Sequence, residues 1–176
     1  MVVSLAGAIV ERGHLLFGLV FLVLVIDETR RAVAPTSATG TGRLAQLVFV
    51  VAGFSMWVAT IRADTVSDFF IHSLWADALL LIGGVEWAWR VGALSSRRWL
   101  FAKPGALAIS GLLLFVHLHG AAGSPEARAH IWMGVALLVA GIWGAAVHLA
   151  RSGRGWAAFA QLPAAAFVLL LITYPQ

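Results

Sequence analysis

The stretch from His117 to His130, HLHGAAGSPEARAH, is a short polar segment between two long apolar runs. It holds three of the six histidines of the chain and an acidic residue, Glu126. Ser124 and Pro125 precede that acid in the order of an N-cap, a first helical proline and an acidic first turn, which marks the start of a helix. The stretch therefore predicts the turn of a helical hairpin that carries its ionisable side chains at one end.

The composition on either side of this turn indicates a membrane protein. Hydrophobic residues make up 61% of the 176 residues and charged residues 11%, whereas a soluble domain needs far more polar surface. A bilayer core about 30 Å thick takes about 20 helical residues to cross. The apolar runs predict an all-α, polytopic domain over residues 1–176, with six transmembrane helices in three hairpins, at 13–33, 44–61, 67–90, 104–120, 128–150 and 157–174. Pro163 is expected to kink the last helix.

The basic residues predict the orientation. Nine of the twelve Lys and Arg residues fall in the connections on one side, and Arg12, Arg62 and Arg128 fall on the other. By the positive-inside rule both termini are expected outside the inner (plasma) membrane of a bacterium. The scattered basic residues form no face for a nucleic-acid backbone, so the lipid bilayer is the expected partner. The absence of cysteine excludes disulfides and thiolate metal sites.

This orientation gathers five histidines at the outer end: His14, His72, His117, His119 and His130. In each odd-numbered helix an acid precedes a histidine by three or four residues, which puts both side chains on one helical face. Imidazole and carboxylate groups projecting from neighbouring helices suit a transition metal. The sequence therefore predicts a metal site whose candidate ligands are Glu11, His14, Asp68, His72, His119, Glu126 and His130. An acid at a helix start is also favoured by the helix dipole alone.

Residues near these ligands are expected to support them. His117 and His119 point about 200° apart on a regular helix, so either the helix end frays at Gly120 or only one of the two is a ligand. His119, nearer the turn, is the expected ligand, and His117 and Asp64 are expected around the ligands. Asp77, deeper in the third helix, is a candidate relay for a proton or cation, or a protonated carboxyl that is hydrogen-bonded to a serine.

The HLHG turn, the EARAH sequence and the glycine-rich helix after it resemble the copper-resistance protein D family over residues 104–150. That family consists of polytopic bacterial inner-membrane proteins with histidines at the outer ends of their helices, associated with taking copper from the periplasm. The resemblance implies copper as the metal and a periplasmic metal donor as a partner. The donor atoms themselves leave iron and zinc open.

Three functions remain open from the sequence. The leading interpretation is a metalloprotein for metal uptake, delivery or metal-assisted oxidation. The second is an electron-transfer subunit with a b-type haem bound by two histidines from facing helices, such as His72 and His119. The third is an accessory subunit of a larger membrane complex, because Gly134, Gly141 and Gly144 on the fifth helix suit close helix packing. A hydrolase is disfavoured, since the chain has no H-E-x-x-H pattern.

Overall fold

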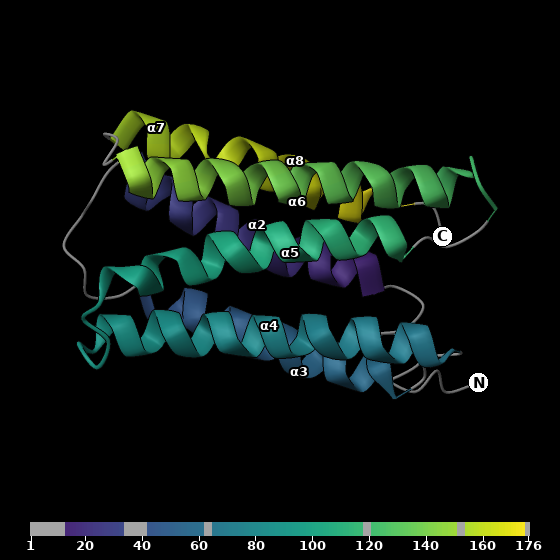
Figure 1. Cartoon of the computed structure of the whole chain (residues 1–176), viewed down its shortest axis with the longest axis horizontal. Helices are drawn as coiled ribbons and strands as arrows, with labels where there is room; N and C mark the ends of the chain where they lie inside the picture. Colours follow the sequence, from purple (N-terminus) through teal and green to yellow (C-terminus); the bar gives the residue numbers. More distant parts are fainter. Residues whose placement is uncertain (1–12, 34–41, 62–64, 118–120, 151–153, 175–176) are drawn as a thin grey trace.

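The computed structural model describes residues 13–33, 42–61, 65–117, 121–150 and 154–174. Within these residues every regular element is a helix (Figure 1). The helices are α2 (Gly13–Val33), α3 (Gly42–Thr60), α4 (Val66–Arg90), the 3₁₀ helix η1 (Arg97–Phe101), α5 (Ala102–Val116), α6 (Pro125–Ala150), α7 (Arg154–Phe159) and α8 (Gln161–Ile172). The all-α fold expected from the sequence is confirmed for this part of the chain.

Four helical stretches are long and apolar enough to cross a membrane: Val66–Trp89, Arg97–Val116, Pro125–Ala150 and Gly155–Ile172. The length and composition of these stretches indicate a multi-pass helical membrane protein. The apolar part of α3 is shorter, and α2 ends in a charged segment that includes Asp27, Glu28 and Arg31. Six crossings, and the placement of both termini outside, remain predictions.

Two helix ends differ from the expected boundaries. α5 ends at Val116, and His117 is its C-cap with φ −101° and ψ 65°, so the helix stops short of residue 120. The last helix is divided into α7 and α8 at Ala160. Pro163 explains that division, because proline lacks a backbone N–H and its ring crowds the carbonyl four residues earlier, at Phe159. A break before Pro163 therefore takes the place of a simple kink.

The helices pack as a closed ring. Going around it, α2 contacts α3, α3 contacts α4, α4 contacts α5, α5 contacts α6, α6 contacts α8, and α8 returns to α2 (Figure 1). The closest pairs are α5 with α6, α3 with α4 and α2 with α8. Helices from the two ends of the chain therefore lie side by side and close the ring around a central space.

Glycines explain why α5 and α6 approach so closely. A Cβ atom at Gly111 would lie 2.6 Å from the backbone nitrogen of Leu138, and one at Gly141 would lie 2.5 Å from the carbonyl oxygen of Pro104. Such small residues let two helix backbones meet. Gly134 also faces Gly111, and Gly144 lies against the ring of Pro104. The close helix packing expected of Gly134, Gly141 and Gly144 is therefore found within the chain, against α5.

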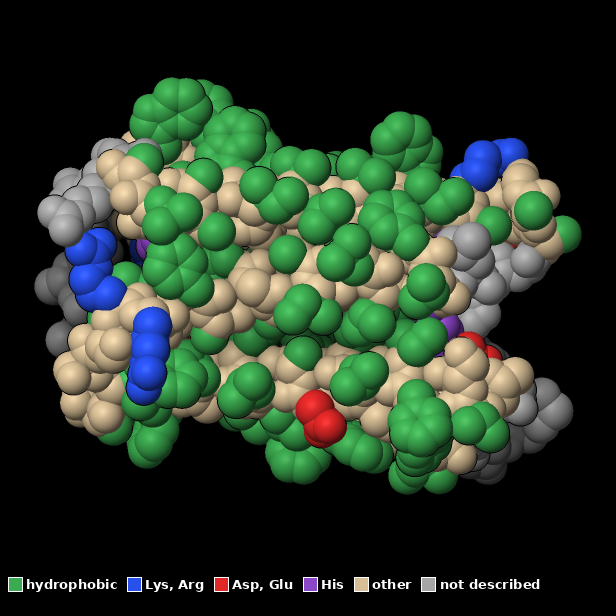
Figure 2. Space-filling view, viewed as in Figure 1, with side chains coloured by type: hydrophobic (Ala, Val, Ile, Leu, Met, Phe, Trp, Pro, Cys, Tyr) green, Lys and Arg blue, Asp and Glu red, His purple; other side chains and the backbone are tan. Residues whose placement is uncertain are grey.

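Large hydrophobic side chains cover the outside of the bundle (Figure 2). Ile109 on α5, Trp132 and Ile142 on α6 and Leu169 on α8 are each 60–62% exposed. Exposed apolar area on this scale is unusual for a protein surrounded by water. It suits helices surrounded by lipid.

Candidate functional site

Four histidines from four helices lie together at the end of the bundle where α2, α4 and α6 begin and α5 ends. The ring centroids of His72 and His117 are 4.7 Å apart, and those of His117 and His130 are 5.7 Å apart. His14 continues the line, with its centroid 5.8 Å from that of His130. These four side chains, here called the histidine row, run from α4 to α2. These are four of the five histidines that the sequence places at one end of the bundle, and the fifth, His119, lies outside the described residues.

Asp68 holds one histidine of this row. Its Oδ1 atom lies 3.4 Å from Nδ1 of His117, and its Oδ2 atom accepts a hydrogen bond of 2.8 Å from the hydroxyl of Thr65. Thr65 is the N-cap of α4 and accepts a hydrogen bond from the backbone N–H of Asp68. The capping motif at the start of α4 therefore fixes the carboxylate beside α5, where it meets His117.

His130 is held in a comparable way by its own helix. Its Nδ1 atom lies 3.0 Å from the backbone carbonyl oxygen of Glu126. A carbonyl only accepts hydrogen bonds, so Nδ1 of His130 carries the hydrogen and the lone pair of the neutral ring is on Nε2. The Asp68 carboxylate beside Nδ1 of His117 likewise favours a hydrogen on that nitrogen. Both rings are buried, with exposures of 4% for His117 and 1% for His130.

Tyr174, just beyond α8, completes this end of the bundle. Its ring stacks on His14 with centroids 3.8 Å apart, and its hydroxyl oxygen lies 3.3 Å from Nδ1 of His130. Burial, with a smaller contribution from the negative charge of Glu126, raises the pKa of Tyr174 to about 12. The phenol is therefore neutral at physiological pH and adds no charge to the histidine row.

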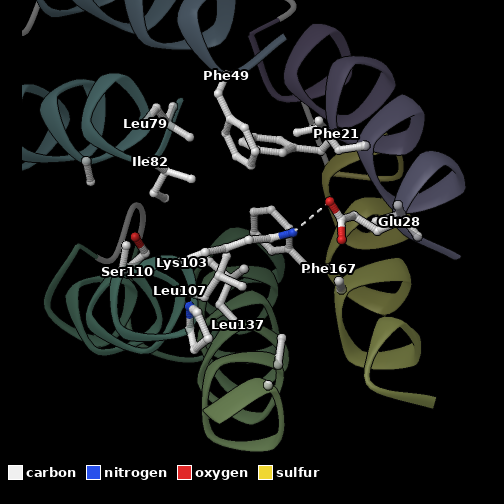
Figure 3. Close-up of a pocket in the computed structure, with 18 of the residues that line it drawn as sticks. Phe21, Glu28, Phe49, Leu79, Ile82, Lys103, Leu107, Ser110, Leu137 and Phe167 are labelled. Carbon is white, nitrogen blue, oxygen red and sulfur yellow. Dashed lines mark ion pairs between the residues drawn. The ribbon is translucent and has the colours of Figure 1, made fainter. Parts of the chain in front are cut away.

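A cavity of about 830 Å³ runs along the inside of the ring and includes the histidine row in its lining. Its middle is lined by hydrophobic side chains such as Phe21, Phe49 and Phe167 (Figure 3). At the far end Lys103 of α5 reaches across to Glu28 of α2, with Nζ 3.4 Å from Oε1. The cavity thus has imidazoles at one end, an apolar middle and an ion pair at the other.

Trp75 places a hydrogen-bond donor in this lining. Its ring centroid lies 5.2 Å from that of His117 and 5.6 Å from that of His72. Its indole Nε1 is buried and has no hydrogen-bond partner among the residues that the structure describes. A buried donor without an acceptor is unfavourable, so an acceptor from beyond the described residues is expected beside it.

The remaining predicted site residues fall in three places. Glu11, Asp64 and His119 lie outside the described residues. The side chain of Glu126 is partly exposed at the start of α6, and its backbone carbonyl is the group that meets His130. Asp77 is exposed on the outside of α4 and accepts a hydrogen bond of 3.2 Å from the indole of Trp57, so the expected relay along the interior and the expected serine partner are both wrong.

Sequence reasoning missed Tyr174 and Trp75. Tyr174 follows the last apolar helix at the same end as His14, and it is the single tyrosine of the chain. An amphipathic side chain at that position was a usable signal, since a phenol there can reach the polar end of the bundle. Trp75 lies three residues after His72, on the same helical face, but tryptophans at such positions commonly only pack.

Within the described ranges no group of three or more His, Asp and Glu side chains is arranged so that it could hold a metal ion. Comparisons with protein-family models, with curated proteins and with solved structures find no match for this chain. The class of the molecule therefore follows from its fold and surface, which are those of a helical membrane protein.

Proposed function

We propose that this chain binds a b-type haem at the histidine end of its cavity and transfers electrons in the membrane. The observation that carries the proposal is the pair of buried imidazoles, His117 and His130, at the end of an apolar cavity of about 830 Å³. Each has its Nδ1 atom directed at an oxygen acceptor. Iron-binding and zinc-binding histidines are commonly oriented by such an acceptor, which leaves Nε2 for the metal.

The number of donors favours haem over a bare ion. A metal ion held only by protein needs about four donor atoms, about three of them from side chains even in open sites. A haem brings the four nitrogens of its macrocycle and takes only one or two axial ligands from the protein. No three described side chains of the histidine row form a site for a bare ion. The row is therefore closer to what a haem requires, which is one or two histidine ligands.

The spacing of the two rings is also suitable. With metal–nitrogen bonds of about 2.0 Å, imidazoles on opposite sides of one iron have ring centroids about 6 Å apart. The centroids of His117 and His130 are 5.7 Å apart and those of His14 and His130 are 5.8 Å apart, whereas those of His72 and His117 are only 4.7 Å apart. His117 and His130, the two buried rings, would hold the haem iron, with His14 and His72 beside them. This replaces the pair His72 and His119 expected from the sequence.

Trp75 supports a cofactor that carries acceptors. The carboxylates of a haem can accept a hydrogen bond from its buried indole N–H, whereas a bare cation cannot. A bound haem supplies reversible one-electron chemistry. The chain contributes two oriented imidazoles, an apolar lining that excludes water and a neutral Tyr174 beside His130.

A single metal ion is the second candidate, and the four imidazoles of the histidine row favour it, because a haem uses at most two. Copper is the first choice, with iron and zinc as alternatives. Uptake, delivery or metal-assisted oxidation would then be the role, with a periplasmic donor. The side chains of the histidine row would have to turn toward one point to bind the ion.

The proposed orientation has six membrane crossings and both termini outside. The histidine row then lies on the extracytoplasmic side of the bacterial inner membrane. Arg97 and Arg98, at the opposite end of the bundle, support this orientation because basic residues concentrate on the cytoplasmic side.

Substitution of the proposed ligands tests the function. We expect His117→Ala and His130→Ala each to lower the affinity for haem at least tenfold when haemin is titrated into the purified protein and followed by visible absorption. His148→Ala is the matched control, because His148 lines the other end of the same cavity. Unchanged haem affinity in both ligand variants would exclude the assignment.

A further inference from the structure

Asp77 is an acidic residue in the middle of a membrane span with its side chain on the outside of the bundle. It lies near the centre of the span Val66–Trp89, about 17 Å from either end at 1.5 Å per residue. Its side chain does not line the cavity and is exposed. Ionisable groups at this depth almost always face a bundle interior or a water-filled cavity and pair with another group. In the isolated chain, Asp77 instead faces outward from the bundle.

The surroundings of Asp77 are apolar. On α4 its outward neighbours are Phe70, Leu74 and Leu81, at helical spacings of three or four residues and with exposures of 61%, 54% and 63%. The adjacent helix α3 adds Phe54, which is 61% exposed. Figure 2 shows an acidic side chain surrounded by hydrophobic side chains midway along α4. In a bilayer this face would place a carboxyl group against lipid chains.

Trp57 satisfies only part of the hydrogen-bonding capacity of the Asp77 carboxyl group. Its indole Nε1 donates a hydrogen bond of 3.2 Å to Oδ1 of Asp77 from α3. The indole holds the carboxyl in place but brings no positive charge. The fixed, outward-facing acceptor is therefore arranged for a donor that comes from outside the chain.

We infer that the outer face of α3 and α4 around Asp77 docks against a transmembrane helix of another protein, and that this helix carries a lysine or arginine at mid-membrane depth. Charge complementarity identifies the occupant. A cation on the partner would pair with Asp77, and the apolar side chains around it would pack on the partner helix and exclude lipid. This inference does not depend on the proposed haem site.

A second copy of the chain lacks the required cation. All twelve Lys and Arg residues lie near the ends of the apolar runs or between them, and the sequence has none from residue 67 to 89, from 104 to 127 or from 129 to 150. Lys103 is close to the start of α5 and pairs with Glu28 in the cavity. Two copies related by a twofold axis along the membrane normal would instead bring Asp77 against Asp77, which repel each other when ionised.

A model transmembrane peptide tests the inference directly. The probe is a leucine-rich helix with one lysine at its centre, and the control peptide has leucine at that position. Since the chain has no cysteine, a single Ser95→Cys substitution in the loop after α4 allows labelling, and energy transfer to labelled peptide in lipid vesicles measures binding. We expect the lysine peptide to bind at least tenfold more tightly than the control, and Asp77→Asn to remove this preference.

The variants separate docking from folding. Asp77→Asn keeps an oxygen acceptor for Trp57, so its helix content and thermal midpoint should equal those of the unsubstituted protein. Asp77→Leu should also fold and should bind both peptides equally. Equal binding of the two peptides to the unsubstituted protein would overturn the inference. Self-association in vesicles that is abolished by Asp77→Asn would also overturn it, in favour of a second copy.

Discussion

Asp68 affects the proposed site through His117, although the two residues belong to different helices. The Oδ1 atom of Asp68 lies 3.4 Å from Nδ1 of His117, and its Oδ2 atom accepts a hydrogen bond from the hydroxyl of Thr65. An acceptor on the far nitrogen fixes the tautomer of a ligating histidine and raises its basicity. The sequence predicts that Asp68 is near a histidine, because acids and histidines recur at helix starts. It could not predict which histidine, because His117 is reached across the gap between α4 and α5.

We expect Asp68→Asn to weaken haem binding by about 10- to 100-fold while leaving the fold intact, because the amide is a poorer acceptor and can present its donor to His117. Haemin titration monitored by absorption measures the effect. Asp77→Asn is the control, since it makes the same change on the outside of the same helix, away from the cavity. If Asp68→Asn binds haemin as tightly as the unsubstituted protein, the contact with His117 has no effect on binding.

Tyr174 gives a pH-dependent prediction at the same scale. Burial raises its pKa to about 12, whereas an exposed tyrosine has a pKa of about 10. A raised pKa means that the folded state favours the neutral phenol. The stabilisation is therefore fully present below about pH 10 and is lost as the pH rises from about 10 through 12.

Because Tyr174 is the single tyrosine, the absorbance of the phenolate reports on it alone. The titration midpoint in detergent should lie well above that of the same protein unfolded in denaturant. Coincident midpoints in the two states would contradict the burial of the phenol beside His14 and His130.

At the scale of elements, the sequence predicts where helices lie but not how far each one runs. Apolar runs and flanking polar residues are local signals, so the helices fall within a few residues of the expected positions. The end of α5 at Val116 was not predicted. With α5 ending there, the argument that His117 and His119 point in opposite directions does not apply, because it assumes a regular helix through both. The last helix is likewise divided into two helices at Ala160, whereas the sequence predicted only a kink at Pro163.

The contact between α5 and α6 gives a prediction about stability. A Cβ atom at Gly141 would lie 2.5 Å from the carbonyl oxygen of Pro104, so Gly141→Ala should lower the free energy of unfolding by about 1–3 kcal/mol. Circular dichroism during denaturation in detergent measures this. Gly84→Ala is the matched control, because among the described residues a Cβ at Gly84 meets nothing within 4 Å beyond the backbone of its own helix. It should be neutral or stabilising by up to about 1 kcal/mol. Equal effects at the two positions would contradict the close approach.

At the scale of the whole molecule, the ring of helices and its cavity could not be derived from the sequence. The positive-inside rule brings helix ends to one side, which is enough to gather histidines at one end. It says nothing about which helices are neighbours, and the contact of α2 with α8 depends on packing between the two ends of the chain. The cavity follows from that closure. This is why a site of several metal ligands was the leading prediction and a cofactor pocket was the second.

The central claim is that the histidine end of the cavity holds a haem. It is tested most directly by the visible spectrum and the metal content of the unsubstituted protein, purified in mild detergent from haem-replete cells. We expect close to one haem per chain, sharp absorption bands on reduction with dithionite, and an iron content equal to the haem content. A colourless protein, or one with stoichiometric copper or zinc and no haem, would contradict the claim.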